Sequence, residues 1–226
     1  GLLLNNNLRL NFLIPLLSLI ILVSFFFLSR DFLYAGTNVS GILSEDTTWE
    51  LEDSPFYVTG DVQIPNGVTL TLEAGVTVSF SDAHEILVKG SIVANGSASN
   101  KITFTNVDTN ITTGATMLKF KDSDLSTSQL SHINMIGSNY STDTAIRIGQ
   151  ESEHNQGEKN TNTLTVSNVE ITSILVLTDG YSTGAKLVLS NATISSSKVK
   201  GNYPRSEAIE IINATISDSV INPDSY

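Results

Sequence analysis

The chain has 226 residues, with 12 basic and 23 acidic side chains and a formal net charge of −11. So acidic a chain is a poor partner for nucleic acid or for an anionic membrane surface, because both would repel it. Cysteine is absent, which excludes a disulfide framework and any thiolate chemistry. The length suits one domain once an N-terminal segment is set aside.

That N-terminal segment contains an apolar stretch from Phe12 to Leu28, preceded by Arg9 and followed by small residues around Ala35. A basic start, an apolar stretch and small residues at the cut are typical of a signal peptide. The stretch is also almost long enough to be a membrane-spanning helix. We therefore predict that residues 1–35 are a signal peptide or a membrane anchor, which is the chain's one contact with a membrane. The protein is then secreted or held at the cell surface.

From residue 36 on, apolar and polar residues alternate in short runs, which is the pattern of strands with one buried face. Three later runs share a longer motif, in which an Asn follows two inward apolar residues. These are Asn168, Asn191 and Asn213, which lie 23 and 22 residues apart. We align an earlier run with them, in which Asp122 takes the place of the Asn. A repeat of this length built from strands predicts a solenoid.

The motif has a physical reason in a stack of coils. One coil cannot bury its apolar face alone, whereas coils about 4.8 Å apart pair every strand with its copies above and below. Asn and Asp tolerate the left-handed backbone of a tight turn. We therefore predict a side-chain ladder along the stack, made of Asp122, Asn168, Asn191 and Asn213. A second column contains Tyr140, Tyr181 and Tyr203, each six residues before a strand.

The opening coils contain a run that reads Tyr57-Val-Thr-Gly60-Asp-Val62-x-Ile64-Pro65-x-Gly67, and a second copy begins at Val88-Lys-Gly90. Together with the Asn ladder, this run resembles secreted microbial right-handed parallel β-helix proteins of the pectate-lyase-like superfamily. The resemblance implies an all-β fold, a single-stranded right-handed parallel β-helix over residues 36–226, with coils of about 22–30 residues. We expect this domain to be truncated at its C-terminus.

Outward positions of the strands indicate where a ligand would bind. Lys119, Lys121 and Arg147 fall on neighbouring coils of one face in this alignment, which gathers three of the 12 bases. Such a patch would hold a polysaccharide or surface glycan, or it would keep the sheet face soluble. The Tyr column would offer aromatic faces to sugar rings, or it would pack along the stack.

No catalytic residues are predicted. Glycoside hydrolysis needs two carboxyls about 5–10 Å apart, whereas the outward acids of the aligned strands reduce to Glu210. The histidines are far apart and no Asp-rich calcium loop occurs, so no metal or cofactor is predicted, although the acidic composition is compatible with Ca²⁺.

We therefore predict a glycan-binding adhesive module or a structural stalk. Two alternatives remain. One is a polysaccharide lyase or glycoside hydrolase of the β-helix class. The other is a purely structural surface filament or coat protein, with self-association along the solenoid.

Six Asn-x-Ser/Thr sequences occur in the chain. Asn191 and Asn213 are ladder residues and are poorly placed to carry a glycan. The candidate glycosylation sites are Asn95, Asn110 and Asn139.

Overall fold

A computed structural model of the chain describes residues 36–80, 83–106, 115–138, 142–149, 160–179, 185–202 and 209–225. The chain divides into two compact units, Gly1–Leu33 and Tyr34–Tyr226. The predicted signal or anchor segment lies outside the described residues. In the part of the chain that is described, no helix has the length and hydrophobicity that crossing a bilayer requires.

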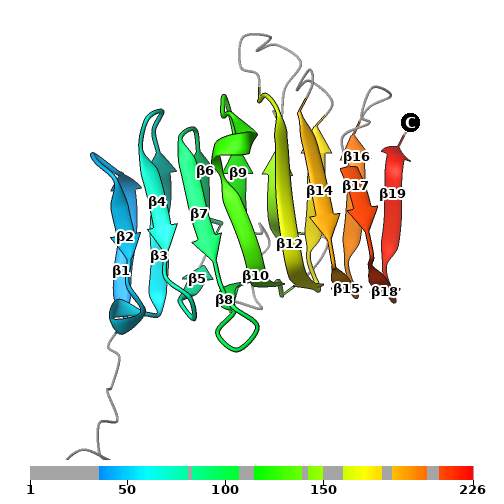
Figure 1. The fold of residues 1–226 in the computed structure, drawn as a ribbon, viewed down its shortest axis with the longest axis horizontal. Coiled ribbons are helices and arrows are strands. Elements are labelled where there is room, and N and C mark those ends of the chain that lie inside the picture. The colour runs from blue at the N-terminus through cyan, green and yellow to red at the C-terminus, as the bar shows by residue number, and fades with distance from the viewer. Residues whose placement is uncertain are drawn as a thin grey trace, which may run out of the picture. The chain divides into compact units, whose positions relative to one another are not determined.

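The described residues form 19 strands and two short 3₁₀ turns, η1 (Leu51–Asp53) and η2 (Leu125–Thr127), and they contain no α-helix. All the strand pairings among them are parallel. The strands are arranged in a row from β1 to β19 as the chain proceeds (Figure 1). The prediction of an all-β chain of stacked parallel strands is therefore confirmed.

The strands stand in three columns, in each of which a strand pairs with the equivalent strand of the next coil. The first column contains β2 (Thr47–Trp49), β4 (Thr69–Leu72), β7 (Ser91–Asn95), the first halves of β10 (Gln129–Ile136) and β12 (Thr163–Thr172), β14 (Lys186–Ser190) and β17 (Ile209–Ile212). The second contains the first parts of β1 (Thr37–Ile42) and β3 (Phe56–Ile64), β5 (Thr77–Phe80), β8 (Ile102–Asn106), the second halves of β10 and β12, β15 (Thr193–Ser195) and β18 (Thr215–Ser217). The third contains the ends of β1 and β3, then β6 (Glu85–Val88), β9 (Thr116–Phe120), β11 (Thr144–Ile148), β13 (Leu175–Asp179), β16 (Lys198–Asn202) and β19 (Val220–Ser225).

In each column, the inward side chains of successive coils lie on top of one another and form apolar stacks. One stack of the third column consists of Val62, Ile86, Leu118, Ile146, Val176, Val199 and Ile221. All but the last of these are almost completely buried. Full burial of such a side chain is worth roughly 1.5–3 kcal/mol, and only neighbouring coils can supply it. The alternation read from the sequence is therefore what holds one coil on the next.

The two ends of the stack differ. At the first coils, the rings of Trp49 and Phe56 stack with centroids 4.7 Å apart and are almost completely buried. In the last coil, Ile216 is 44% exposed, although its register partner Ile194 in the coil before is fully buried. The coil of β18 covers Ile194, whereas no further coil among the described residues covers Ile216.

Coil length varies more than predicted, because the corners between columns differ in length. Leu130 and Val166 are register partners 36 residues apart, beyond the predicted range of about 22–30. The alignment of Gly60 with Gly90 in the early coils, which implies a spacing of 30 residues, is also wrong. The register places Val62 beside Ile86, 24 residues further on.

The Asn ladder has the predicted form at three positions. Asn168, Asn191 and Asn213 follow first-column strands or half-strands, with φ angles of 53°, 50° and 52°. Asn191 Nδ2 donates to Asn168 Oδ1 at 3.3 Å, and Asn213 Nδ2 donates to Asn191 Oδ1 at 3.4 Å. The ladder of these three residues is therefore confirmed.

Asp122 does not belong to this ladder. Its backbone is left-handed, with φ of 55°. It follows β9, however, whose Phe120 pairs with Ile148 in the third column. The alignment of Asp122 with the Asn residues is therefore wrong, since those residues follow the first column. The place beside Asn168 is taken by His132 on β10, with φ of 51°.

Replacing Asn191 with Leu should lower the free energy of unfolding by about 1–2 kcal/mol, measured by urea denaturation. Leu tolerates the left-handed backbone poorly, and both ladder hydrogen bonds are lost. Asn191→Gly keeps the backbone relaxed and should cost less. The control is Thr165→Leu at an exposed strand position. If Thr165→Leu lowers the free energy of unfolding as much as Asn191→Leu does, the ladder does not contribute to stability.

Candidate functional site

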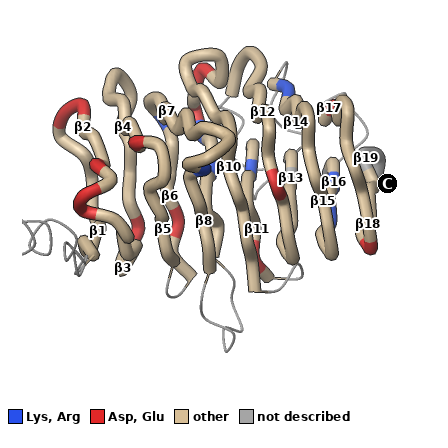
Figure 2. Tube along the Cα trace, turned by 60° about the horizontal axis from the view of Figure 1, so that its bottom comes forward, with Lys and Arg blue, Asp and Glu red and all other residues tan. Residues whose placement is uncertain are grey.

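Charge is distributed unevenly along the stack. Residues 36–88 contain nine acidic residues and no Lys or Arg. Figure 2 shows acidic positions gathered on the coils of β1 to β4. Electrostatic repulsion from Glu52, with a hydrogen bond between the two side chains, raises the pKa of Glu50, and Glu73 adds a smaller repulsion. An anionic ligand would therefore be repelled by the first coils and must bind further along the stack.

The outer face of the third column gathers six of the eight basic residues that the structure describes. Lys119 on β9 and Arg147 on β11 are register partners, and Leu177 on β13 and Lys200 on β16 continue the same row. Lys198 lies two residues before Lys200, with the buried Val199 between them, so both lysines face outward. With two lysines that directly follow β6 and β9, these residues form what we call the basic face: Lys89, Lys119, Lys121, Arg147, Lys198 and Lys200.

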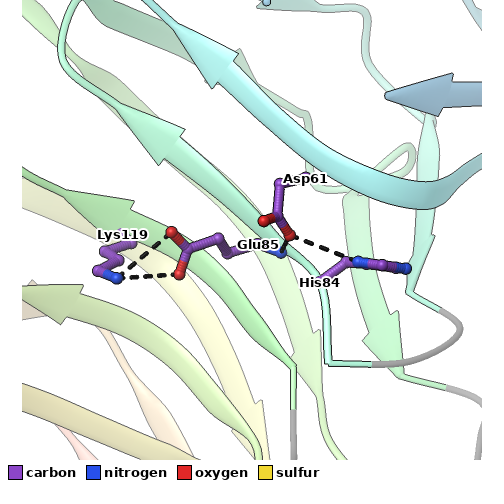
Figure 3. A network of polar contacts seen from close by, with 4 residues as sticks. All are labelled: Asp61, His84, Glu85 and Lys119. Atoms are coloured by element: carbon purple, nitrogen blue, oxygen red, sulfur yellow. Dashed lines mark hydrogen bonds and ion pairs between the residues drawn. The ribbon is translucent and has the colours of Figure 1, made fainter. Parts of the chain in front are cut away.

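A network of polar contacts surrounds Lys119 on the basic face (Figure 3). Lys119 Nζ lies 3.1 and 3.3 Å from the two carboxylate oxygens of Glu85, and both side chains are more than two-thirds buried. The backbone N–H of Glu85 donates to Asp61 Oδ1 at 3.2 Å. His84 Nδ1 lies 3.4 Å from the same oxygen. The charge of Lys119 is therefore matched inside the protein, which weakens its attraction for an external anion.

Two more lysines are matched in the same way on the other columns. Lys101 pairs with Glu170 across the second column, and Lys186 pairs with Glu210 across the first. Each pair joins different coils. Lys198 and Lys200, by contrast, form no ion pair with another described residue, and this distinguishes them from the three paired lysines.

The structure brings together two of the three predicted patch residues as direct neighbours, Lys119 and Arg147, and Lys121 follows the same column. Their binding role remains a prediction. Sequence reasoning missed Lys198 and Lys200, although the alternation Lys-Val-Lys was a signal for two outward bases on one strand. The reason is that outward positions of these coils were read only on the strands that precede the Asn residues, whereas Lys198 and Lys200 lie on a later strand of their coil.

The other predicted site residues are mostly beyond what is described. Tyr140, Tyr181, Tyr203, Asn110 and Asn139 all lie outside the described residues.

Asn95 is described and is exposed at the end of β7. Its Nδ2 donates to Gln129 Oε1 at 3.1 Å, and its Oδ1 accepts from Ser131 Oγ at 3.0 Å. A glycan on Asn95 would replace one N–H of this side-chain amide, so it would have to fit beside these contacts.

A buried carboxylate holds the corner from which β11 carries Arg147 to the basic face. Asp143 is fully buried. Its Oδ1 accepts from Asn106 Nδ2 at 2.8 Å and from the N–H of Ala115 at 3.3 Å. Its Oδ2 accepts from the N–H of Ser138 at 2.7 Å and from Ser138 Oγ at 2.8 Å. Asn106 is the last residue of β8, Ala115 directly precedes β9 and Ser138 follows β10, so one side chain ties three strands at this corner.

No metal centre is formed by the residues that the structure describes. Among the described residues, no three His, Asp or Glu side chains are arranged to hold an ion. Comparisons of the chain with protein-family models, with curated proteins and with solved structures found no match.

Replacing Asp143 with Asn should lower the free energy of unfolding by roughly 1–3 kcal/mol, because an amide N–H₂ then faces buried donors that lose their acceptor. Thermal or urea unfolding measures the loss. Asp53→Asn is the control, since it removes the same charge at an exposed position. If both variants unfold like the parent protein, the Asp143 side chain does not hold this corner.

Proposed function

We propose that residues 36–226 form a single-stranded right-handed parallel β-helix of an exported protein, secreted or held at the cell surface, that binds polysaccharide as an adhesive or stalk module. Three columns of parallel strands in register support the fold. The resemblance of the opening coils to the pectate-lyase-like superfamily supports the handedness. The apolar stretch before Ala35 supports export.

The observation that carries the binding proposal is the basic face. Six of the bases stand on one column of an acidic protein, and three of them, Lys119, Arg147 and Lys200, share a single row. Successive parallel strands lie about 4.8 Å apart, so the row presents three cations across four strands, with Leu177 between Arg147 and Lys200. A long polymer with repeated polar groups can contact several of these positions at once, which raises its overall affinity beyond that of a single contact.

A second candidate function is favoured by the network at Lys119. Carboxylates of Asp61 and Glu85, the imidazole of His84 and the Lys119 ammonium lie in one chain of contacts, with Arg147 next in the row. Groups of these types act as general acids and bases when a substrate proton is within hydrogen-bond reach. A polysaccharide lyase or hydrolase would use this end of the basic face.

The test is incubation of the protein with neutral and acidic polysaccharides, with retention and chain cleavage recorded together. We expect retention without cleavage. Cleavage that is lost in Glu85→Gln would replace the binding module with the enzyme. Neither retention nor cleavage on any polymer would refute both and leave a purely structural filament or coat protein.

A further inference from the structure

The last coils of the third column present two lysines that form no ion pair with any residue the structure describes. These are Lys198 and Lys200, which are half-buried and face outward on β16. Their register partners on β13 and β19 are all uncharged: Leu175, Leu177, Val220 and Asn222. The positions directly opposite the two lysines therefore supply no counter-charge, and the nearest acidic position of β13, Asp179, pairs with Asn202, two residues beyond Lys200.

Lys119, on an earlier coil of the basic face, has its charge compensated within the protein. Lys119 is matched by Glu85, and Asp61 lies behind Glu85. An approaching anion would have to displace the Glu85 carboxylate, or remain beside it and be repelled. Electrostatic attraction for an anion is therefore weaker at Lys119 than at Lys198 and Lys200, which gives a gradient between these positions of the basic face.

From this gradient we infer that Lys198 and Lys200 are the anion-binding centre of the basic face, and that the ligand is a linear polysaccharide bearing carboxylate or sulfate groups. The inference rests on the proposed function and names its ligand class. The polymer lies across the strands, along the row that continues to Arg147. Two lysines on one strand are about 7 Å apart, and Arg147 is two coils, or roughly 10 Å, away. These distances allow one chain to contact all three.

Glu85 acts in this arrangement as an internal competitor. While its carboxylate holds Lys119, that ammonium group is not available to a polymer. Replacing Glu85 with Gln keeps the side chain's size and removes the charge, so Lys119 becomes available and the row lengthens by one cation toward the first coils.

Binding is measured on the full chain with dextran sulfate and alginate, and with uncharged dextran as the matched polymer, at low and high ionic strength. Lys198→Ala with Lys200→Ala should weaken binding of both polyanions about tenfold at low salt, and added salt should narrow the difference. Lys101→Ala with Lys186→Ala is the control. It removes the same charge from two lysines that are already paired on the other columns, and should change affinity far less.

Glu85→Gln should strengthen binding of both polyanions, and Lys119→Ala in the parent protein should have a smaller effect than the Lys198 and Lys200 double variant. Equal losses for the double variant and its control would overturn the assignment of the centre. Retention of dextran with no preference for dextran sulfate would overturn the acidic ligand and leave glycan binding standing. Failure of every polymer to bind would sink the proposed function as well.

Discussion

Hydrogen bonding in register between successive parallel strands is the constraint on which the rest of this structure depends. Because side chains alternate between the two faces of a strand, a shift of one residue would move every inward side chain outward. The register fixes which residues stack, and the third column shows the consequence on both faces. Inward, it aligns Ile86, Leu118 and Ile146 in the core. Outward, it places Lys119 beside Arg147.

The same register organises the charges. Because neighbouring coils are separated by more than 20 residues of chain, ion pairs such as Lys119–Glu85 join groups 34 residues apart in sequence. Pairs of this kind connect coils on all three columns, while the acidic first coils have no bases of their own. The outer surface therefore changes from acidic to basic along the third column, and the transition lies at Glu85 and Lys119.

The sequence predicted what repeats with constant spacing. Coils joined by short corners preserve a period of 22 or 23 residues, so Asn168, Asn191 and Asn213 could be aligned by inspection. The alignment failed where corners are long. Asp122 follows two alternating apolar residues, just as Asn168 does. It nevertheless lies after a strand of the third column, because the corners in this part of the chain are longer. Spacing alone cannot tell which column a strand joins, because every column has the same alternation.

The candidate site was predictable in part for the same reason. Lys119 and Arg147 were found because both stand outward within alternating runs. That Lys200 lies in the same row follows only from the register of the strands, which is visible in three dimensions. The Glu85 partner of Lys119 lies 34 residues away in the sequence. Two of the four donors to Asp143, Asn106 Nδ2 and the N–H of Ala115, lie 37 and 28 residues away, so no local pattern marks them.

The most direct measurement of the register is disulfide formation between Cys residues introduced at Lys119 and Arg147. The chain has no native Cys, and neighbouring parallel strands place paired Cα atoms about 4.8 Å apart, within the range of a disulfide. Lys119→Cys with Arg147→Cys should form an intramolecular disulfide under mild oxidation. Lys121→Cys with Arg147→Cys, offset by two residues, should form it far less readily. A disulfide that forms preferentially in the offset pair would contradict the row of cations and every inference drawn from it.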